Sequence, residues 1–213
     1  MKLKYFLRFA FYLVVAVGIS GARAGAYDDY FHAVAQDDGP AMTRLLQRGL
    51  DPNTRDEQGL VGLYLALRAG SFSVAQALLA APGLEVDALN PAGETPLMMA
   101  ALRGHAEWAE KLLARGARVH QEGWSPVLYA ASAPDAKALA LLLDRGAPVD
   151  ARAPNGTTPL MMAARYGSEA SVDLLLARGA DPKLRNDHQL GAGDFARQGG
   201  REALARRLDA LSR

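Results

Sequence analysis

The seven-residue stretch TPLMMAA occurs twice in this chain, at residues 95–101 and 158–164. A degenerate third copy, SPVLYAA at residues 125–131, lies between them, so the copies begin 30 and 33 residues apart. Self-similarity at a period of roughly 20–50 residues is typical of proteins built from stacked structural repeats. This periodicity restricts the fold more than any other feature of the chain.

A second marker, Leu-Leu-x-Arg-Gly, has the same period. It occurs at residues 45–49, 112–116, 142–146 and 175–179, and Leu78-Leu79 keeps the register without the Arg. The irregular steps come from one extra residue beside Pro82 and from a loop, residues 117–122, that is three residues shorter than its counterparts. The register predicts six repeats, which we place at residues 27–55, 56–89, 90–119, 120–152, 153–185 and 186–213.

Each repeat has the sequence features of two short helices. Thr or Ser before Pro favours a helix start, because the hydroxyl caps free N–H groups and Pro suits the first turn. Gly104 and Gly167 are expected to end the first helix. The second helix is expected to direct its leucines inward, with Leu113 and Leu175 buried. Because so short a pair cannot bury its own apolar face, the repeats are expected to stack into a solenoid.

These residues resemble the ankyrin repeat, whose signature is T-P-L-H-x-A at a period of 33. The match covers nearly all of the chain after residue 24, and the repeats that begin at Thr95 and Thr158 follow the signature closely. Val61-Gly62 replaces Thr-Pro in the second repeat, and Gly191-Ala192-Gly193 replaces Thr-Pro-Leu in the last.

The family His is absent, and Met98, Leu128 and Met161 stand in its place. In the family that His helps to tie one repeat loop to the next, so the resemblance implies less rigid loops here. It also implies the fold class, an all-α ankyrin-repeat solenoid of stacked helix-turn-helix units with hairpin loops over residues 25–213. The last repeat is expected to be a polar cap, with arginines such as Arg201 facing water.

The first 24 residues have the pattern of a cleaved secretory signal peptide. Residues 1–8 are basic, residues 9–19 are apolar, and Ala22-Arg23-Ala24 matches an A-x-A cleavage site. The apolar run is shorter than the ~20 residues that a transmembrane helix needs. Cleavage is expected after Ala24, with Ala26 as the alternative. The pattern looks bacterial, which predicts a periplasmic or secreted protein that is not attached to a membrane after cleavage.

Composition excludes several classes of function. Residues 1–24 carry four basic residues and no acid, so the rest of the chain has 20 basic against 23 acidic residues, a net charge of −3. This balance argues against a nucleic-acid partner, which needs a basic surface. The chain has no cysteine, which removes disulfides, zinc–thiolate sites and thiol nucleophiles.

Residues with catalytic potential do not gather into a recognisable site. The four histidines fall in different repeats without metal-ligand spacing. Residues 123–127, GWSPV, begin like a nucleophile elbow but lack the glycine required after Ser. The sequence therefore predicts no enzyme, no metal and no cofactor.

Two repeated features have two interpretations each. The arginines of the second marker are consistent with an anion-binding stripe, but each precedes a helix-ending Gly, which favours a role at the helix C-terminus. These arginines are Arg48, Arg115, Arg145 and Arg178. Trp108 and the paired methionines at residues 98–99 and 161–162 are expected in the core, with a Met-rich binding surface as the alternative.

In ankyrin repeats the hairpin loops and first helices line the concave binding face, and the resemblance places that face here by register. It includes polar positions such as Glu94 and Thr157. The predicted partner-binding residues are apolar, aromatic or arginine side chains that stacking does not need: Leu60, Arg68, Leu102, Arg103, Trp124, Arg165 and Tyr166. Trp, Tyr and Arg dominate interface energetics. Partial packing against neighbouring loops is the alternative explanation.

The sequence thus predicts a monomeric, non-catalytic module that binds another protein, such as a periplasmic enzyme, through its concave face. Two alternatives stay open, because a fold does not fix a function. One is an immunity or inhibitor protein against a toxin. The other is a small-ligand receptor or enzyme with a groove site that the sequence does not reveal.

The signal-peptide pattern makes a direct prediction about the exported protein. Intact-mass and N-terminal analysis should show Gly25 as the first residue, because cleavage follows the A-x-A site. A full-length product retained in the membrane would contradict this prediction.

Overall fold

The computed structural model describes residues 25–212, and these residues are almost entirely helical. Within this span there is no β-strand, and an isolated bridge joins Arg55 to Val61. The expected all-α class is therefore confirmed. The predicted signal peptide, residues 1–24, lies outside the described residues. No helix in the described part is long and apolar enough to span a membrane.

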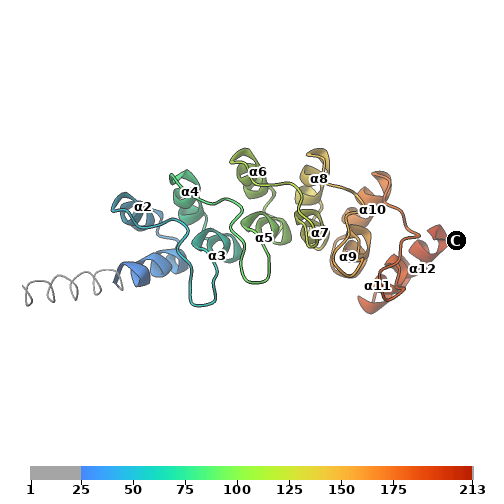
Figure 1. The fold of residues 1–213 in the computed structure, drawn as a ribbon. Coiled ribbons are helices and arrows are strands. Elements are labelled where there is room, and N and C mark those ends of the chain that lie inside the picture. Colours follow the sequence, from blue (N-terminus) through green and yellow to red (C-terminus); the bar gives the residue numbers. More distant parts are fainter. Residues whose placement is uncertain (1–24, 213) are drawn as a thin grey trace, which may run out of the picture. The chain divides into compact units, whose positions relative to one another are not determined.

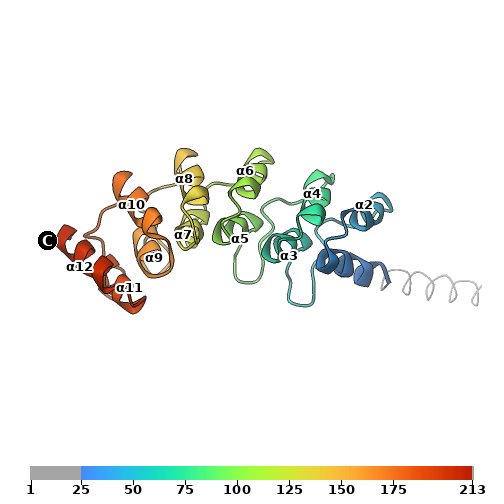
Figure 2. The same cartoon turned by 180° about the vertical axis from the view of Figure 1, so that it is seen from behind.

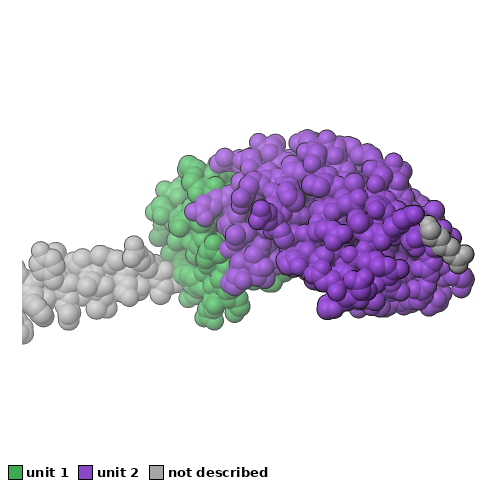
Figure 3. Space-filling view, turned by 45° about the vertical axis from the view of Figure 1, so that its right-hand side comes forward, with its two compact units in different colours: residues 1–84 green, residues 85–213 purple. Residues whose placement is uncertain are grey.

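The chain up to Leu84 belongs to an N-terminal unit, shown in green in Figure 3. Its described part contains a helix over residues 25–36, followed by α2 (Gly39–Gln47), α3 (Gly62–Ala69) and α4 (Phe72–Ala80). Helix α4 packs against both α2 and α3. The unit ends just after Pro82, where the sequence carries its one extra residue.

The chain from Glu85 onward forms a C-terminal unit of stacked helix pairs (Figures 1 and 2). The pairs are α5 (Pro96–Leu102) with α6 (Ala106–Ala114), α7 (Pro126–Ala131) with α8 (Lys137–Asp144), α9 (Pro159–Tyr166) with α10 (Glu169–Ala177), and α11 (Ala192–Gln198) with α12 (Glu202–Leu211). The first helices pack in a row, α5 on α7, α7 on α9 and α9 on α11. Each pair thus covers an apolar face of its neighbour.

The Thr-Pro sequences start helices as expected. The hydroxyls of Thr95 and Thr158 accept hydrogen bonds from the backbone N–H groups of Met98 (3.3 Å) and Met161 (3.4 Å). The methionine sulfurs in turn accept from the N–H groups of the two threonines, at 3.5 Å and 3.4 Å. Methionine at the family's His position therefore completes a reciprocal cap inside its own repeat, although sulfur is a weak acceptor.

Glycine is favoured after two of the first helices, but the physical reason differs between them. Gly104 has a φ of +73°, a left-handed conformation that favours glycine after a helix end. Gly167 ends α9 as expected, but its φ of −84° is open to any residue. A Cβ atom at Gly167 would lie 2.1 Å from the carbonyl oxygen of Ala131, so this glycine is required for close packing.

Tyr30 explains the departure from Thr-Pro at Val61-Gly62. Its side chain is fully buried, and its hydroxyl donates to the carbonyl oxygen of Pro52 at 2.9 Å. A Cβ atom at Gly62 would lie 2.1 Å from that hydroxyl oxygen, so the ring occupies the space of a larger residue at the start of α3. Burial raises the pKa of the Tyr30 phenol well above its ordinary value, because the ionised form would lose its hydration.

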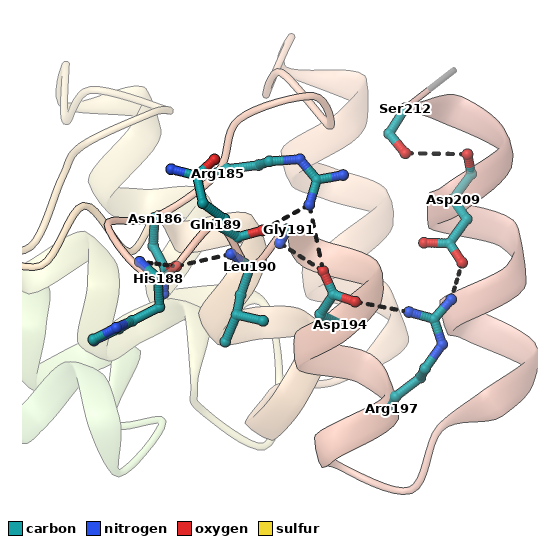
Figure 4. Close-up of polar contacts among 10 residues, drawn as sticks. All are labelled: Arg185, Asn186, His188, Gln189, Leu190, Gly191, Asp194, Arg197, Asp209 and Ser212. Atoms are coloured by element: carbon teal, nitrogen blue, oxygen red, sulfur yellow. Dashed lines mark hydrogen bonds and ion pairs between the residues drawn. The ribbon is translucent and has the colours of Figure 1, made fainter.

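Figure 4 shows how the last repeat compensates for the loss of Thr-Pro-Leu. The Asp194 carboxylate accepts the backbone N–H of Gly191 at 2.9 Å, which satisfies a free donor at the start of α11. Asp194 also pairs with Arg197 at 2.9 Å, and Arg197 pairs with Asp209 of α12. A Cβ atom at Gly193 would collide with the Asp209 carboxylate. Glycine at this position therefore lets α12 approach α11.

The expectation that Arg201 faces water is wrong. Its Nη1 donates to the carbonyl oxygens of Ala163, Ala164 and Gly167 at 2.9–3.1 Å. These carbonyls lie in the last turn of α9 and just after it, where helix carbonyls run out of intrahelical donors, although Ala163 also accepts the N–H of Gly167. Arg201 therefore joins the last repeat to the one before it.

In the C-terminal unit, the second helices α6, α8 and α10 each fully bury one leucine of the Leu-Leu pair. Leu112, Leu142 and Leu175 are 0% exposed, whereas Leu113 is only half-buried. The expectation for Leu175 is confirmed and that for Leu113 is wrong. Successive residues on a helix point about 100° apart, so only one leucine of a pair faces the first helices. Trp108 is buried, as expected for a core residue.

The repeated arginines lie at the ends of second helices. Arg48, Arg115, Arg145 and Arg178 are the C-cap residues of α2, α6, α8 and α10. Arg145 pairs with Glu110 at 3.2 Å and Arg178 pairs with Asp144 at 2.8 Å, each reaching back one repeat. These pairs favour the helix-end interpretation over an anion-binding stripe. Exposed pairs of this kind contribute about 0–1 kcal/mol each.

The leucine pairs provide a matched test of the packing. Leu112→Ala and Leu175→Ala should each lower the free energy of unfolding by about 2–5 kcal/mol, because truncation leaves a cavity at a fully buried site. Leu113→Ala, one position along the same helix, should cost less because that side chain already contacts water. Urea denaturation followed by circular dichroism measures all three. Equal losses for Leu112→Ala and Leu113→Ala would show that the assigned helix face is wrong.

The helix starts provide a second test. Ser125 precedes α7 as Thr95 precedes α5, but it makes no capping hydrogen bond, and its buried hydroxyl has no partner among the described residues. Ser125→Ala should leave stability unchanged or raise it, since an unpaired buried hydroxyl is unfavourable. Thr95→Ala should cost about 0.5–2 kcal/mol by removing a cap. Chemical denaturation of both variants checks the difference, and an equal loss at both positions would refute it.

Candidate functional site

A small groove lies across the first helices of three successive repeats in the C-terminal unit. It has a volume of about 190 Å³, and apolar atoms make up most of its lining. Its lining residues are Leu102, Trp124, Tyr129, Ser132 and Met162. Leu102 ends α5, Ser132 is the C-cap of α7, and Met162 lies on α9.

The groove residues come from three repeated positions. The central repeat, which contains α7, supplies a residue at each of these three positions: Trp124, Tyr129 and Ser132. When the repeats are aligned on the TPLMMAA motif, Leu102 of the preceding repeat occupies the position that Ser132 has in the central repeat. Met162 of the following repeat occupies the position that Tyr129 has in the central repeat. The stacking of identical helices therefore assembles one surface from residues about 30 positions apart.

The shortened loop at residues 117–122 positions Trp124. Ahead of α5, the backbone N–H of Asn90 donates to the carbonyl oxygen of Glu94 at 3.0 Å and closes a long hairpin, visible in Figure 1. Ahead of α7, the side-chain amide of Gln121 donates to the carbonyl oxygens of Trp124 (3.0 Å) and Gly93 (3.2 Å). A side chain thus ties the short loop to the preceding hairpin.

Tyr129 holds the indole of Trp124 from the side. The two rings meet edge to face, with 6.2 Å between centroids. The Tyr129 hydroxyl donates to Glu94 Oε1 at 2.9 Å, and the Asn90 amide donates to Glu94 Oε2 at 2.8 Å. Both carboxylate oxygens of Glu94 are therefore engaged. Trp124 keeps a partly exposed surface, and these contacts hold its indole at the groove.

The structure brings two of the seven predicted binding residues, Leu102 and Trp124, into the groove. Sequence reasoning missed Tyr129 and Ser132; it expected Met162 in the core, which is wrong because Met162 is half-buried and lines the groove, as its alternative of a binding surface allowed. The register of the repeat contains the signal for them, because each shares a first-helix position with another residue on this face. Thr157 was expected on the same face, but it is 2% exposed, so that expectation is wrong.

Three further predicted residues lie beside the groove without lining it. Arg103 directly follows Leu102 as the C-cap of α5 and is exposed. Arg165 and Tyr166 lie about one helical turn after Met162 on α9. The Arg165 guanidinium lies 4.9 Å from the centroid of the Tyr166 ring, and Tyr166 is 56% exposed.

The remaining two predicted residues belong to the N-terminal unit. Leu60 is half-buried in the loop ahead of α3, and its backbone N–H donates to Asp56 Oδ1 at 2.8 Å. Arg68 is exposed in the last turn of α3. Neither residue lines the groove.

The N-terminal unit has a larger cavity of about 260 Å³ with a different character. Its lining includes side chains of both charges, among them Asp29, Asp38, Arg44 and Arg48. Such a mixed lining favours no single class of ligand. Across residues 25–212, no group of three or more His, Asp or Glu residues is arranged to hold a metal ion.

Comparison with known proteins identifies relatives of the chain. The family model described as "Ankyrin repeats (3 copies)" matches residues 31–122 and 109–186. The B-cell lymphoma 3 protein homolog of Mus musculus is 33% identical over 157 residues, which is 70% of this chain and 35% of that protein. A putative ankyrin repeat-containing protein of Treponema pallidum (strain Nichols) is 35% identical over 115 residues, 52% of this chain and 39% of that protein. The chain thus spans little more than a third of these relatives.

A solved structure is also similar to this chain. It contains a predatory endopeptidase from Bdellovibrio bacteriovorus in complex with an immunity protein. The similarity has a TM-score of 0.72 at 29% sequence identity and covers 85% of this chain and 97% of the matched chain.

The family match extends over residues 31–186, and the described residues form the stacked helix pairs that its signature requires. This chain therefore belongs to the ankyrin-repeat family.

Proposed function

We propose that this protein is an exported, monomeric, non-catalytic module that binds a partner protein at the groove around Trp124. Ankyrin repeats are protein–protein interaction modules, and the similar solved structure is itself a complex of two proteins. The periplasm is the proposed location because of the signal-peptide pattern in residues 1–24.

The observation that carries this proposal is a partly exposed Trp in a preformed apolar groove. Buried stacking does not require Trp124, because the corresponding positions hold Glu94 and Thr157 in the neighbouring repeats. Trp, Tyr and Arg near the centre of a contact are the usual hot spots of protein interfaces. Here Trp124 belongs to the central repeat, with Arg103 in the preceding repeat and Arg165 and Tyr166 in the following one.

The size of the groove favours a protein partner over a small-molecule ligand. Sites for drug-sized ligands have volumes of roughly 300–1,000 Å³ and bury most of the ligand surface. The groove here has about 190 Å³. Such a volume suits one large side chain of a partner, with the rest of the contact made on the surrounding surface.

A second candidate function is restraint of an endopeptidase by this chain. The similar solved structure, which holds an endopeptidase with an immunity protein, favours this candidate. In this case the partner would be an exported hydrolase of the same cell, and binding would lower its activity.

The test compares the tagged exported protein with two variants in capture from a periplasmic extract, quantified by mass spectrometry. Trp124→Ala should lose a partner that wild type retains, because it removes the hot spot. Leu211→Ala should retain it, because this 46% exposed leucine lies on α12, outside the groove. Titration calorimetry with the purified partner should then show at least tenfold weaker binding for Trp124→Ala, about 1.4 kcal/mol.

The captured partner also tests the second candidate function, restraint of an endopeptidase. If it is a hydrolase, an equimolar amount of wild type should inhibit it and Trp124→Ala should inhibit it less. Circular dichroism provides the control for folding. Normal partner binding by folded Trp124→Ala would place the binding surface elsewhere, and unfolding of the variant would assign Trp124 to the core.

A further inference from the structure

The two ends of the groove differ in charge. Glu94 directly precedes the Thr95 cap of α5, and Arg103 directly follows that helix, so acid and base mark opposite ends of α5. On the other wall, Arg165 lies in the last turn of α9. It is three residues after Met162, so the two side chains lie on neighbouring parts of one helix face. The groove, whose lining contains none of these charges, therefore has an acid beside it on the loop side and arginines beside it at the helix C-termini.

The charged groups also differ in the hydrogen-bond and ion-pair partners that they have. Glu94 accepts hydrogen bonds on both oxygens, from Tyr129 and Asn90. Arg165 donates to the side-chain oxygen of Gln198 at 2.6 Å and lies over Tyr166, both of which are neutral. Among residues 25–212, neither Arg103 nor Arg165 forms an ion pair.

Two of the repeated arginines in the same unit are paired. Arg145 and Arg178, at the ends of second helices, each pair with an acid of the preceding repeat. Arg103 and Arg165 do belong at helix C-termini, where a cation is favourable. Their positive charges nevertheless lack a carboxylate, and they flank an apolar surface.

We propose that the groove binds a partner segment that combines a large apolar side chain with an adjacent carboxylate. The apolar side chain packs against Trp124 and Met162, and the Asp or Glu carboxylate pairs with an arginine at the end of either wall, Arg103 or Arg165. Guanidinium groups suit this role, because they stay charged and present paired donors to a carboxylate. Glu94 disfavours the reversed orientation by repelling a carboxylate at the loop end. This inference specifies the partner chemistry of the site in the proposed function and rests on that function for its biological meaning.

Small probes test the chemistry without knowledge of the partner. The probes are 3-phenylpropionate and 3-phenylpropylamine, which share an apolar group and carry opposite charges. The chain has two Trp residues, so the indole N–H signals in an NMR spectrum report separately on the groove and on the core. Trp124→Phe assigns the groove signal, and the buried Trp108 serves as an internal reference.

The Trp124 signal should shift saturably with 3-phenylpropionate, at the millimolar affinity typical of very small ligands. The amine should bind at least fivefold more weakly, and the Trp108 signal should stay in place. In the double variant Arg103→Gln/Arg165→Gln, the preference for the carboxylate should disappear. Arg206→Gln, which removes one exposed arginine of α12, should keep it.

Several outcomes would overturn the inference. They are an unresponsive Trp124 signal, equal or tighter binding of the amine, and a preference that survives in the double variant. A Trp124 signal that moves with protein concentration alone would show a second copy of the chain in the groove instead. These results are independent of partner capture. Loss of the partner in Trp124→Ala without any carboxylate preference would leave the proposed function standing and remove only this inference.

Discussion

Apolar burial between neighbouring helix pairs is the interaction on which the rest of this structure depends. The helices of the C-terminal unit are short, from 6 residues in α7 to 10 in α12, whereas isolated helices below ~12–15 residues are marginal in water. They persist because leucines such as Leu112, Leu142 and Leu175 are removed completely from water by the adjoining helices. Each such side chain contributes about 1.5–3 kcal/mol relative to exposure.

Because stacking uses one set of repeat positions, the other positions are free to differ between repeats. The residue just before the Thr-Pro or Ser-Pro pair is Glu94, Trp124 or Thr157 in three successive repeats. One backbone position thus supplies a carboxylate that anchors Tyr129, an indole in the groove, and a buried threonine. The groove derives its chemistry from these side chains, and the fold supplies only their spacing.

Departures from the repeat signature are matched by contacts from other parts of the chain. Gly62 stands where the signature has Pro, and the buried ring of Tyr30 fills that space. Gly193 stands where the signature has Leu, and the Asp209 carboxylate approaches it from α12. In both cases a repeat exchanges a standard helix start for a specific contact with a residue of another helix. Sequence patterns detect the lost signature but not the compensating residue, which lies 16 or more positions away.

The sequence by itself determined the repeat period, the helix starts at Thr95 and Thr158, and the family, because caps and periodicity are local properties of the chain. It also selected Leu102 and Trp124, which the structure brings into one groove. Only the tertiary structure decided that Leu112 is buried more fully than Leu113, that Thr157 is enclosed, and that Tyr129, Ser132 and Met162 complete the groove. These outcomes depend on contacts between residues about 30 positions apart, and the direction of each side chain relative to the next repeat is set only when the helices pack.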